Sequence, residues 1–558
     1  MANRNKSFEV RFWEVLPGIL TWATLLGAPI FAYFLPVWIS VFIILFDTYW
    51  FLKAGNVAIH LLHSYATLRS HNKIDWSDWL KRLADKREFR QYLTAKLASE
   101  PRRTMRAILR QQLSRLDALE TDRNLDWNRL YHLIIIPTYR ESYEVLAQSI
   151  RSYFEADYPQ DKLIFVLAYE ERSKEVSLPN AERLKRDFGD RFFRFLTVMH
   201  PDGLPGEAKG KGANISYGAR EAQKLLDELS IPYEDVLVSA FDSDTAVHRN
   251  YFSHLSYDFL TVRKPLQASY QPMPMFHNNI WDTPAIARVI ATSSSFWQLV
   301  EASRPDRLVT FSSHSMNFKT LVDVGFWRVD IIPEDSHIFW QCFLHFNGDY
   351  RSEPLFTTVS MDAVLGESYF GTLVAQYKQK RRWAWGVTEI SLVFPELLRD
   401  RRIPAWKRFL YSERLVVGHY FWATSSIMIA VLGWLPLIFG GARFGSTVLA
   451  VNLPMITRVL MTVATFFLIF SMYINMVLLP PRPAKYGRIR TLAMVLQWVL
   501  SPIVSSVFGS MPAIDAQTRL LFAKYMEFWV TPKIRKSDLE SDALAGTEGA
   551  AALGKAKE

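Results

Sequence analysis

The chain has a single cysteine, Cys342, among its 558 residues, so it has no second thiol for an internal disulfide. No oxidised framework therefore supports the fold, which is compatible with a catalytic part in the cytosol. The sequence also lacks internal repeats, and its only long low-complexity segment is the small-residue tail from about Ser537 onwards.

Acidic residues are fewer than basic ones. The chain has 55 Asp and Glu against 65 Lys and Arg, a formal net charge of +10. Such a charge suits a protein that lies against an anionic membrane leaflet or handles phosphorylated substrates, and nucleic acid is the other usual partner. The apolar content of 49% and aromatic content of 14% are high for a soluble protein.

Charged residues are almost absent from four stretches. Residues 16–62 contain only Asp47 and Lys53, and residues 416–439, 459–480 and 491–514 contain none. A transmembrane helix needs about 20 apolar residues, so residues 16–62 predict two spans with Pro36 at the turn. A cleaved signal peptide is the alternative, but its apolar part would be only ~7–15 residues and no second span would follow at once.

The loops between these stretches predict the orientation. The 481–490 loop contains four cations and the 440–457 loop only one, Arg443, and short loops rich in Lys and Arg lie on the cytoplasmic side. The N-terminus and the segment between the second and third spans are then cytoplasmic too. Residues 491–514 form either a third C-terminal span or a re-entrant hairpin broken at Ser501-Pro502. We favour the hairpin, because a full crossing would place the basic TPKIRK segment outside the cell.

A transporter or catalytically silent scaffold is a weaker interpretation. Ionisable residues inside the predicted spans are few, which does not favour an ion pathway. They are Asp47, Lys53, His60 and His419.

The middle of the chain changes its pattern at about residue 130. Residues 74–126 are polar, basic and helical, with a break at EPRRT, typical of a solvated or interfacial helix pair. Beyond them, apolar runs such as YHLIIIPTY, KLIFVLAYE, RFFRFLTVM and EDVLVSAFD alternate with helical patterns such as YEVLAQSIRSYF. This alternation predicts an α/β domain with a mostly parallel sheet, whose ligands bind beyond the carboxyl ends of the strands.

Carboxylates follow one of these strands. Asp242 and Asp244 come directly after EDVLVSAF, and residues two apart in an extended segment point the same way. Such a pair can hold Mg²⁺ or Mn²⁺ together with diphosphate oxygens. Turn or helix-cap aspartates are the alternative, and the position at a strand end favours the metal site.

Three further groups are candidate site residues. Lys209 and Lys211 lie in a Gly-rich stretch that offers a phosphate cradle or a flexible surface loop, and it does not fit a P-loop. Glu334 and Asp335 precede an apolar-patterned helix, either as helix caps or as a general base. Three residues of QKRRW, an amide, a cation and an indole, share one helical face if the segment is helical, with the spacing to hold a diphosphate and a sugar ring, or to anchor an interfacial helix. These are Gln379, Arg382 and Trp383.

These motifs, in this order, resemble the family-2 inverting glycosyltransferases, specifically the membrane branch with the cellulose, chitin and hyaluronan synthases. The resemblance runs from about Leu133 to Gly386 and rests on PTYRE, KGKGAN, DSD, SHSMNFKTLVDVGFW, PEDSHIFWQ and QKRRW, the last matching the specific Q-x-x-R-W pattern. It implies a GT-A-like catalytic domain between N- and C-terminal transmembrane helices, a nucleotide-sugar donor, and a carbohydrate or lipid-linked acceptor. A nucleic-acid partner is not expected.

The resemblance also implies roles for individual residues. Thr138, Tyr139 and Glu141 would line the nucleotide pocket, and Asp242 and Asp244 would bind the metal and the donor diphosphate. Asp335 would be the catalytic base with Glu334 beside it. Gln379, Arg382 and Trp383 would hold the diphosphate and the acceptor sugar at the membrane surface.

Two departures from the family pattern are present. The aspartate pair that commonly contacts the nucleobase after the second strand is replaced by VLAYEERS, so Glu170 or Glu171 must substitute for it. Pro333 stands where the synthases often have Thr. No C-terminal regulatory barrel fits into the roughly 45 residues after Ile514.

The expected organisation follows from these assignments. A cytoplasmic N-terminus (1–15) and two spans (16–62) lead through a basic helical linker (63–129) to the glycosyltransferase domain (130–366). Interfacial helices with Q-x-x-R-W (367–412), two spans plus a third span or hairpin (413–514), and an amphipathic segment with a flexible tail (515–558) complete the chain. We expect polysaccharide synthesis at the cytoplasmic face of the cell membrane with export, or transfer of one sugar to a membrane lipid.

Overall fold

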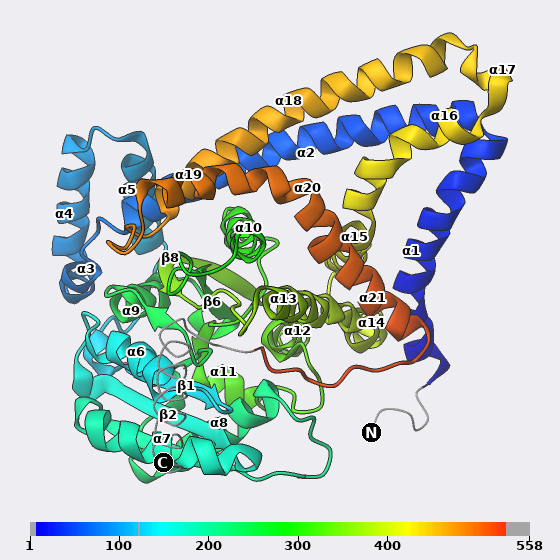
Figure 1. Ribbon diagram of the computed structural model, residues 1–558. Helices are drawn as coiled ribbons and strands as arrows, with labels where there is room; N and C mark the ends of the chain where they lie inside the picture. Colours follow the sequence, from blue (N-terminus) through cyan, green and yellow to red (C-terminus); the bar gives the residue numbers. More distant parts are fainter. Residues whose placement is uncertain (1–6, 121–122, 532–558) are drawn as a thin grey trace, which may run out of the picture.

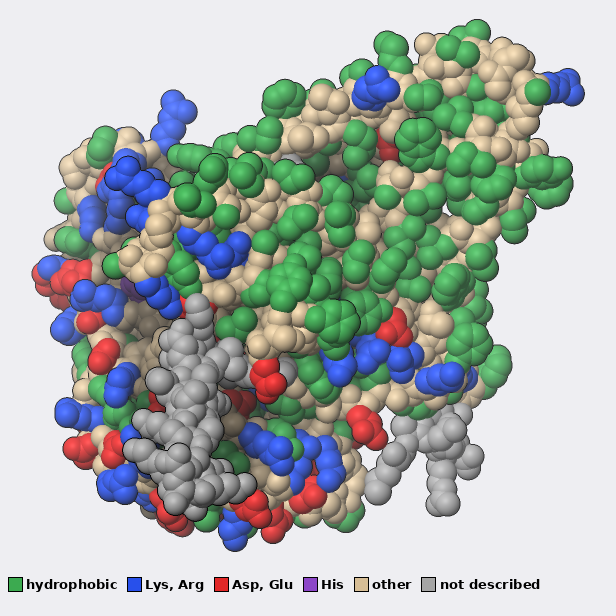
Figure 2. All heavy atoms as spheres, viewed as in Figure 1, with side chains coloured by type: hydrophobic (Ala, Val, Ile, Leu, Met, Phe, Trp, Pro, Cys, Tyr) green, Lys and Arg blue, Asp and Glu red, His purple; other side chains and the backbone are tan. Residues whose placement is uncertain are grey.

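A computed structural model describes residues 7–120 and 123–531 of the chain. A domain built on one mixed β-sheet occupies one end of the molecule, and long helices extend away from it at the other (Figure 1). Hydrophobic side chains gather over the long helices, whereas Asp, Glu, Lys and Arg gather over the sheet domain (Figure 2). This division agrees with the expected insertion of a polar domain between membrane helices.

The N-terminal helices agree with the predicted pair of spans. α1 (Phe8–Phe34) and α2 (Pro36–His71) meet at Leu35, and α2 begins with Pro36 at a position that tolerates proline. Three shorter helices follow: α3 (Trp76–Arg82), α4 (Lys86–Ser99) and α5 (Arg103–Asp117). The predicted break at EPRRT is therefore confirmed as the gap between α4 and α5.

One eight-stranded sheet, in the order β3-β2-β1-β4-β7-β6-β8-β5, forms the centre of the domain. β1 pairs in parallel with both β2 and β4, β2 with β3, and β6 with β8, whereas β7 is antiparallel to β4 and β6, and β5 to β8. The strand bounds are β1 (Tyr131–Thr138), β2 (Leu163–Glu170), β3 (Arg194–His200), β4 (Val236–Ala240), β5 (Ala246–Val247), β6 (Ala268–Met275), β7 (Ser315–Asn317) and β8 (Arg351–Ser360).

Helices cover both faces of this sheet and form two apolar cores. One core joins the sheet to α3, α4, α5, α6, α7 and α9, and the other joins it to α8, α11, α12 and α14. The helices of the domain are α6 (Tyr143–Phe154), α7 (Lys174–Phe188), α8 (Lys211–Glu228), α9 (Tyr251–Thr261), α10 (Ala285–Ala302), α11 (Phe318–Asp323), α12 (Glu334–His345), α13 (Tyr369–Ala384) and α14 (Glu389–Arg399).

The C-terminal helices extend beyond the predicted apolar runs. They are α15 (Ala405–Val431), α16 (Leu435–Phe439), α17 (Gly441–Gly445), α18 (Val448–Leu478), α19 (Arg488–Leu496), α20 (Ser501–Val504) and α21 (Met511–Leu521). Among the described residues, five helical segments are long and apolar enough to cross a membrane: Phe8–Phe34, Pro36–His71, Ala405–Phe439, Val448–Leu478 and Arg488–Leu521. The chain is therefore a candidate membrane protein in both halves.

The last of these segments is a bent, continuous helical run whose two ends both contact the sheet domain. At its start, Arg490 donates to the carbonyl oxygen of Trp281 at 2.6 Å. Near its end, Asp515 forms an ion pair with Arg381 of α13 at 2.8 Å. Since both ends return to the same domain, the run lies along that domain instead of leading away from it.

Candidate active site

The carboxyl ends of the central strands bring together the carboxylates that were predicted from separate motifs. Asp242 follows β4, and Asp335 lies in the first turn of α12. The Lys211 ammonium group lies between them, with its Nζ 2.7 Å from Asp242 Oδ1 and 2.9 Å from both carboxylate oxygens of Asp335. Three segments far apart in sequence therefore converge on one ammonium group, whose side chain is only 11% exposed.

The glycines around Lys211 explain how it reaches this position. Lys211 is the first residue of α8, and a Cβ at Gly212 would lie 2.8 Å from the carbonyl oxygen of Arg328 and 3.0 Å from the Cβ of Glu334. Only glycine permits this approach of α8 to the start of α12. Lys209, by contrast, is exposed and forms an ion pair with Asp202 at 3.0 Å, so only one of the two predicted lysines meets the carboxylates.

Glu334 and Asp335 have different environments. The side chain of Asp335 is 22% exposed and pairs with Lys211, whereas Glu334 is buried. Burial, together with the nearby charge of Asp335, raises the pKa of the Glu334 carboxyl. The helix-cap alternative is not observed, because the N-cap residue of α12 is Pro333 and no side chain caps it.

Asp244 is held differently from Asp242. Asp244 is buried, and its Oδ2 accepts a hydrogen bond from the backbone nitrogen of Asp362 at 3.0 Å. Asp242 Oδ2 accepts one from the Ser312 hydroxyl at 2.6 Å, a contact that the sequence motifs did not indicate. Among the described residues, no group of three or more His, Cys, Asp or Glu side chains is arranged to hold a metal ion.

The residues after β1 form a hydrogen-bonded clamp, centred on the Glu141 carboxylate, next to these aspartates. The Glu141 carboxylate accepts hydrogen bonds from the Thr138 hydroxyl at 2.8 Å, from the Tyr139 nitrogen at 2.5 Å and from the Ser243 hydroxyl at 3.1 Å. Because Ser243 lies between Asp242 and Asp244, this clamp fixes the loop after β4 to the loop after β1. Glu141 thus holds in place the loop that contains the two aspartates.

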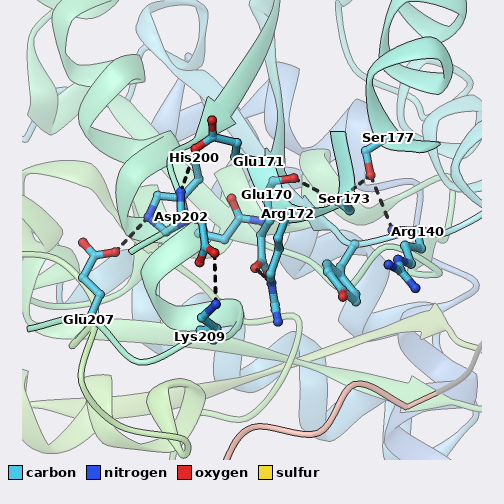
Figure 3. A network of polar contacts seen from close by, with 12 residues as sticks. Arg140, Glu170, Glu171, Arg172, Ser173, Ser177, His200, Asp202, Glu207 and Lys209 are labelled. Atoms are coloured by element: carbon cyan, nitrogen blue, oxygen red, sulfur yellow. Dashed lines mark hydrogen bonds and ion pairs between the residues drawn. The ribbon is translucent and has the colours of Figure 1, made fainter. Parts of the chain in front are cut away.

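The segment after β2 contributes an arginine that sequence reasoning missed. Arg172 forms an ion pair with Glu170, and its guanidinium lies over the Tyr139 ring, 4.1 Å from the centroid. Glu171 accepts a hydrogen bond from the Asp202 nitrogen at 3.0 Å, which ties this segment to the loop that contains Lys209 (Figure 3). The predicted substitute Glu170 is therefore already neutralised by a neighbour.

The Q-x-x-R-W helix, α13, approaches the same site through Arg382. The Arg382 guanidinium lies over the Phe528 ring at 4.9 Å, and a Cβ at Gly210 would lie 2.9 Å from Phe528. The charge of Arg382 also acts on the Glu334 carboxyl. The segment after α21 thus covers the site between α8 and α13, an arrangement that no motif indicated. The TPKIRK segment continues beyond Thr531, outside the described residues.

The other members of that motif have local partners. The Gln379 side-chain oxygen accepts a hydrogen bond from Gln376 at 3.0 Å. Trp383 is half-buried, with the Lys380 ammonium 4.4 Å above its ring centroid. Lys380 also donates to the Ser294 hydroxyl of α10 at 3.0 Å, and burial lowers its pKa to about 7. Trp385 packs in the core instead.

A buried carboxyl group supports the helix that contains Asp335. Glu389 of α14 accepts hydrogen bonds from the Ser336 hydroxyl and from the Trp340 indole, the latter at 3.0 Å. Burial raises its pKa from 4.5 to about 7. Because the pKa of this carboxyl is higher in the folded than in the unfolded protein, the folded protein loses stability as the pH rises from the unfolded pKa to the folded pKa.

Glu389→Gln should therefore weaken the pH dependence of stability. The amide keeps an acceptor for Trp340 and cannot ionise, so the variant should gain roughly 1–3 kcal/mol relative to the wild type as the pH rises from about 4.5 to about 7. Melting temperatures in detergent across this range measure the difference. Parallel curves for the two proteins would contradict the buried-acid assignment.

Comparison with known families bears on this site. Residues 237–479 match the protein-family model described as glycosyl transferase family group 2. The matched segment includes Asp242, Asp244, Glu334, Asp335 and the Q-x-x-R-W helix. The match supports glycosyltransferase activity, and the expected fold class, a GT-A-like mixed sheet between apolar helices, is confirmed.

Solved structures show more distant similarity. The mannosyltransferase PcManGT from Pyrobaculum calidifontis, in complex with GDP-Man and Mn²⁺, is 17% identical with a TM-score of 0.37, covering 69% of this chain and 97% of its own. S. aureus TarS 1-349 in complex with UDP-GlcNAc is 10% identical with a TM-score of 0.34, covering 72% and 94%. A search of curated proteins found no match.

Proposed function

We propose that the protein is an inverting glycosyltransferase of the membrane synthase branch, which extends a polysaccharide at the cytoplasmic face of the cell membrane. The observation that carries the proposal is the convergence of Asp242 and Asp335 at the strand ends, each within hydrogen-bonding distance of the Lys211 ammonium. A diphosphate leaving group needs cations, and an attacking hydroxyl needs a base. This cluster supplies both types of group.

In the proposed reaction, an acceptor hydroxyl attacks the anomeric carbon of a nucleotide-diphospho-sugar. Asp335 takes the hydroxyl proton as the new glycosidic bond forms, and the bond from the anomeric carbon to the diphosphate oxygen breaks with inversion. The nucleoside diphosphate leaves with the electron pair of that bond. Arg382 and Lys211 donate hydrogen bonds to the departing oxygens, and no covalent enzyme intermediate is needed.

The aspartates after β4 fit a divalent metal only if the substrate completes its ligand shell. Mg²⁺ usually takes one or two carboxylates together with substrate phosphates, and two aspartates are what this site provides. Asp242 and Asp244 would hold Mg²⁺ or Mn²⁺, which when bound offsets the charge of the leaving diphosphate. Lys211 must first give up its contact with Asp242, since its ammonium lies 2.7 Å from that carboxylate.

A panel of nucleotide-sugars tests the function. The purified protein is incubated with each donor, with and without EDTA, and released nucleoside diphosphate is measured while any product is sized. A polymer from one donor supports the synthase. A single addition to lipid supports transfer to a membrane lipid, the second candidate, which is favoured by the exposure of Tyr369 (58%) and Phe370 (73%) at the start of α13. Absence of release with every donor would support the scaffold.

The contacts of the 488–521 run support a specific topology. Because both of its ends contact the sheet domain, we propose four crossings, α1, α2, α15 with α16, and α18, with this run along the cytoplasmic surface. The domain division expected from the sequence is otherwise retained. This topology places the sheet domain and residue 531 on the same side of the membrane.

A cysteine at Tyr486 tests this orientation. The Tyr486 hydroxyl donates to Asp282, and Lys485 pairs with the same carboxylate at 2.8 Å, so the loop lies against the catalytic domain. An impermeant maleimide should label the Tyr486→Cys variant only after the cells are opened. Labelling from outside intact cells would reverse the proposed topology.

Trp383→Ala should impair acceptor use more than donor binding. An indole face suits a sugar ring, whereas the diphosphate needs charge and hydrogen bonds. We expect the KM for the acceptor to rise while nucleotide affinity stays near the wild-type value. Trp385→Phe, a change at the buried tryptophan of the same segment, is the control for packing. A larger loss of nucleotide affinity than of acceptor use would refute the assigned role.

A further inference from the structure

A second cluster of charged residues lies where α2, α10 and α15 meet, outside the proposed active site. The segment that follows α10 joins the other two helices. The Ser303 hydroxyl and the His60 Nδ1 of α2 are 2.8 Å apart, and Arg304 donates to the Asn56 side chain of the same helix. Asp306 forms an ion pair with Arg414 of α15 at 2.6 Å. Residues 303–306 thus connect two candidate membrane spans to the catalytic domain.

The face of α2 that meets this segment is polar. Lys53, Asn56 and His60 are spaced three and four residues apart, so they lie on one side of the helix. The neighbouring side chains of Leu52 and Ile59 are apolar and 63% and 65% exposed. A polar stripe inside an otherwise apolar span is costly and marks a functional site.

Cations outnumber carboxylates in this cluster. Its charged members are Lys53, Glu301, Arg304, Asp306, Arg307 and Arg414, which give a formal net charge of +2. Burial raises the pKa of Glu301, and Arg304, Arg307 and Lys53 are close enough to oppose that shift.

Two of these cations lack a carboxylate partner within the described part of the chain. Arg307 is exposed and forms no ion pair there, and the Lys53 ammonium lies over the Trp50 ring at 4.5 Å and the Phe421 ring at 5.1 Å. These rings attract the Lys53 ammonium by cation–π contact, but they carry no carboxylate that could form an ion pair with it. Both cations are therefore available to an external anion.

Exposed apolar side chains border the cluster on α2 and α10. Trp297 of α10 is 49% exposed, and Leu52 and Ile59 extend the apolar surface along α2. Cations beside exposed aromatic and aliphatic side chains are typical of the level at which lipid head groups meet the hydrocarbon region. The surface therefore has one part for a charged group and another for an apolar chain.

We propose that this cluster binds the phosphate of an anionic membrane phospholipid, with Lys53, Arg304 and Arg307 around the phosphate and the acyl chains against Leu52, Ile59 and Trp297. Phosphate oxygens accept the several N–H donors that arginine and lysine present. A zwitterionic lipid brings its own ammonium group into a region that is already positive, so it binds more weakly. The bound lipid would also tie α2 to α10, the helix whose Ser294 contacts Lys380 of the Q-x-x-R-W helix.

Thermal stability of the full chain in detergent tests this proposal. Melting temperatures are measured with added dioleoylphosphatidylglycerol, dioleoylphosphatidylcholine or inorganic phosphate. Three proteins are compared with the wild type: Arg307→Gln, Arg304→Gln/Arg307→Gln, and the control Arg103→Gln/Arg110→Gln. The control removes the same charge from exposed positions of α5 that lack ion pairs among the described residues.

Phosphatidylglycerol should raise the melting temperature of the wild type and of the control equally. Arg307→Gln should lose part of the shift, and the double variant should lose more than half. If the double variant is unstable without lipid, the melting-temperature shift of Arg307→Gln alone decides the test, because Arg307 is exposed and its replacement should not unfold the protein. An equal shift with phosphatidylcholine, a full shift with inorganic phosphate, or variants that match the control would overturn the proposal. The readout is independent of the proposed glycosyltransferase activity.

Discussion

Asp335→Asn should lower sugar transfer by ~10²-fold or more and leave the affinity for nucleoside diphosphate nearly unchanged. The amide has the shape of the carboxylate and cannot accept the hydroxyl proton. Since Asp335 is partly exposed and its partner Lys211 comes from α8, the loss of its charge should not disturb the packing of α12. Turnover and nucleotide binding, both measured in nanodiscs, separate the chemical step from donor binding.

Glu334→Gln is the matched comparison. The two carboxylates are adjacent in the first turn of a helix, where successive side chains point about 100° apart, so only one faces a given reacting atom. Glu334 is buried beside Gly212 and its raised pKa favours the protonated form, which makes it a poor base. We expect a milder loss of turnover. An inactive Glu334→Gln with a nearly normal Asp335→Asn would exchange the roles, and normal turnover in both would exclude a base at this motif.

The sheet and its first helices were largely predictable from the sequence. The run YHLIIIPTY became β1, and the helical pattern at 143–154 became α6 with the same bounds, because burial on both faces of a parallel sheet requires continuous apolar runs. The later strands were not predicted. β7 has only three residues, and β8 contains two Thr and a Pro, so neither differs clearly from a loop in composition.

The carboxylates of the site were predictable, but their neutralising partner was not. The position of Asp242 after a strand predicts a metal site, whereas the choice of Asp335 as the base comes from the resemblance to the family-2 glycosyltransferases. The sequence could not show that Lys211, and not Lys209, reaches both, because that depends on the contact of Gly212 with the start of α12. Phe528 and Arg172 were missed for the same reason, since their roles arise from contacts between distant segments.

The membrane segments show the same limit. Hydropathy predicted the apolar stretches, including the one at 491–514, but hydropathy reports only how apolar a segment is. The direction of the 488–521 run follows from its polar contacts at each end, Arg490 with Trp281 and Asp515 with Arg381. Those contacts agree with the proposed topology, in which this run stays on the same side of the membrane as the sheet domain.

Lys211→Met should abolish most of the transfer activity and at the same time strengthen the binding of Mn²⁺ in the absence of nucleotide. Removing one preorganised cation from a leaving-group site costs roughly 10²–10³-fold in turnover. The ammonium also neutralises Asp242 and Asp335, at 2.7 and 2.9 Å, and without it these carboxylates face each other and attract a divalent cation.

Lys209→Met is the control, because Lys209 is exposed and pairs with Asp202 away from these carboxylates, so both quantities should stay near the wild-type values. Titration of Mn²⁺ by electron paramagnetic resonance, without donor or nucleotide, gives the affinity, and the donor assay gives the turnover. A variant that loses turnover with unchanged Mn²⁺ affinity would show that Lys211 acts only on the substrate. Unchanged turnover would show that the donor diphosphate leaves without this lysine, and that Asp335 acts as a base without its partner.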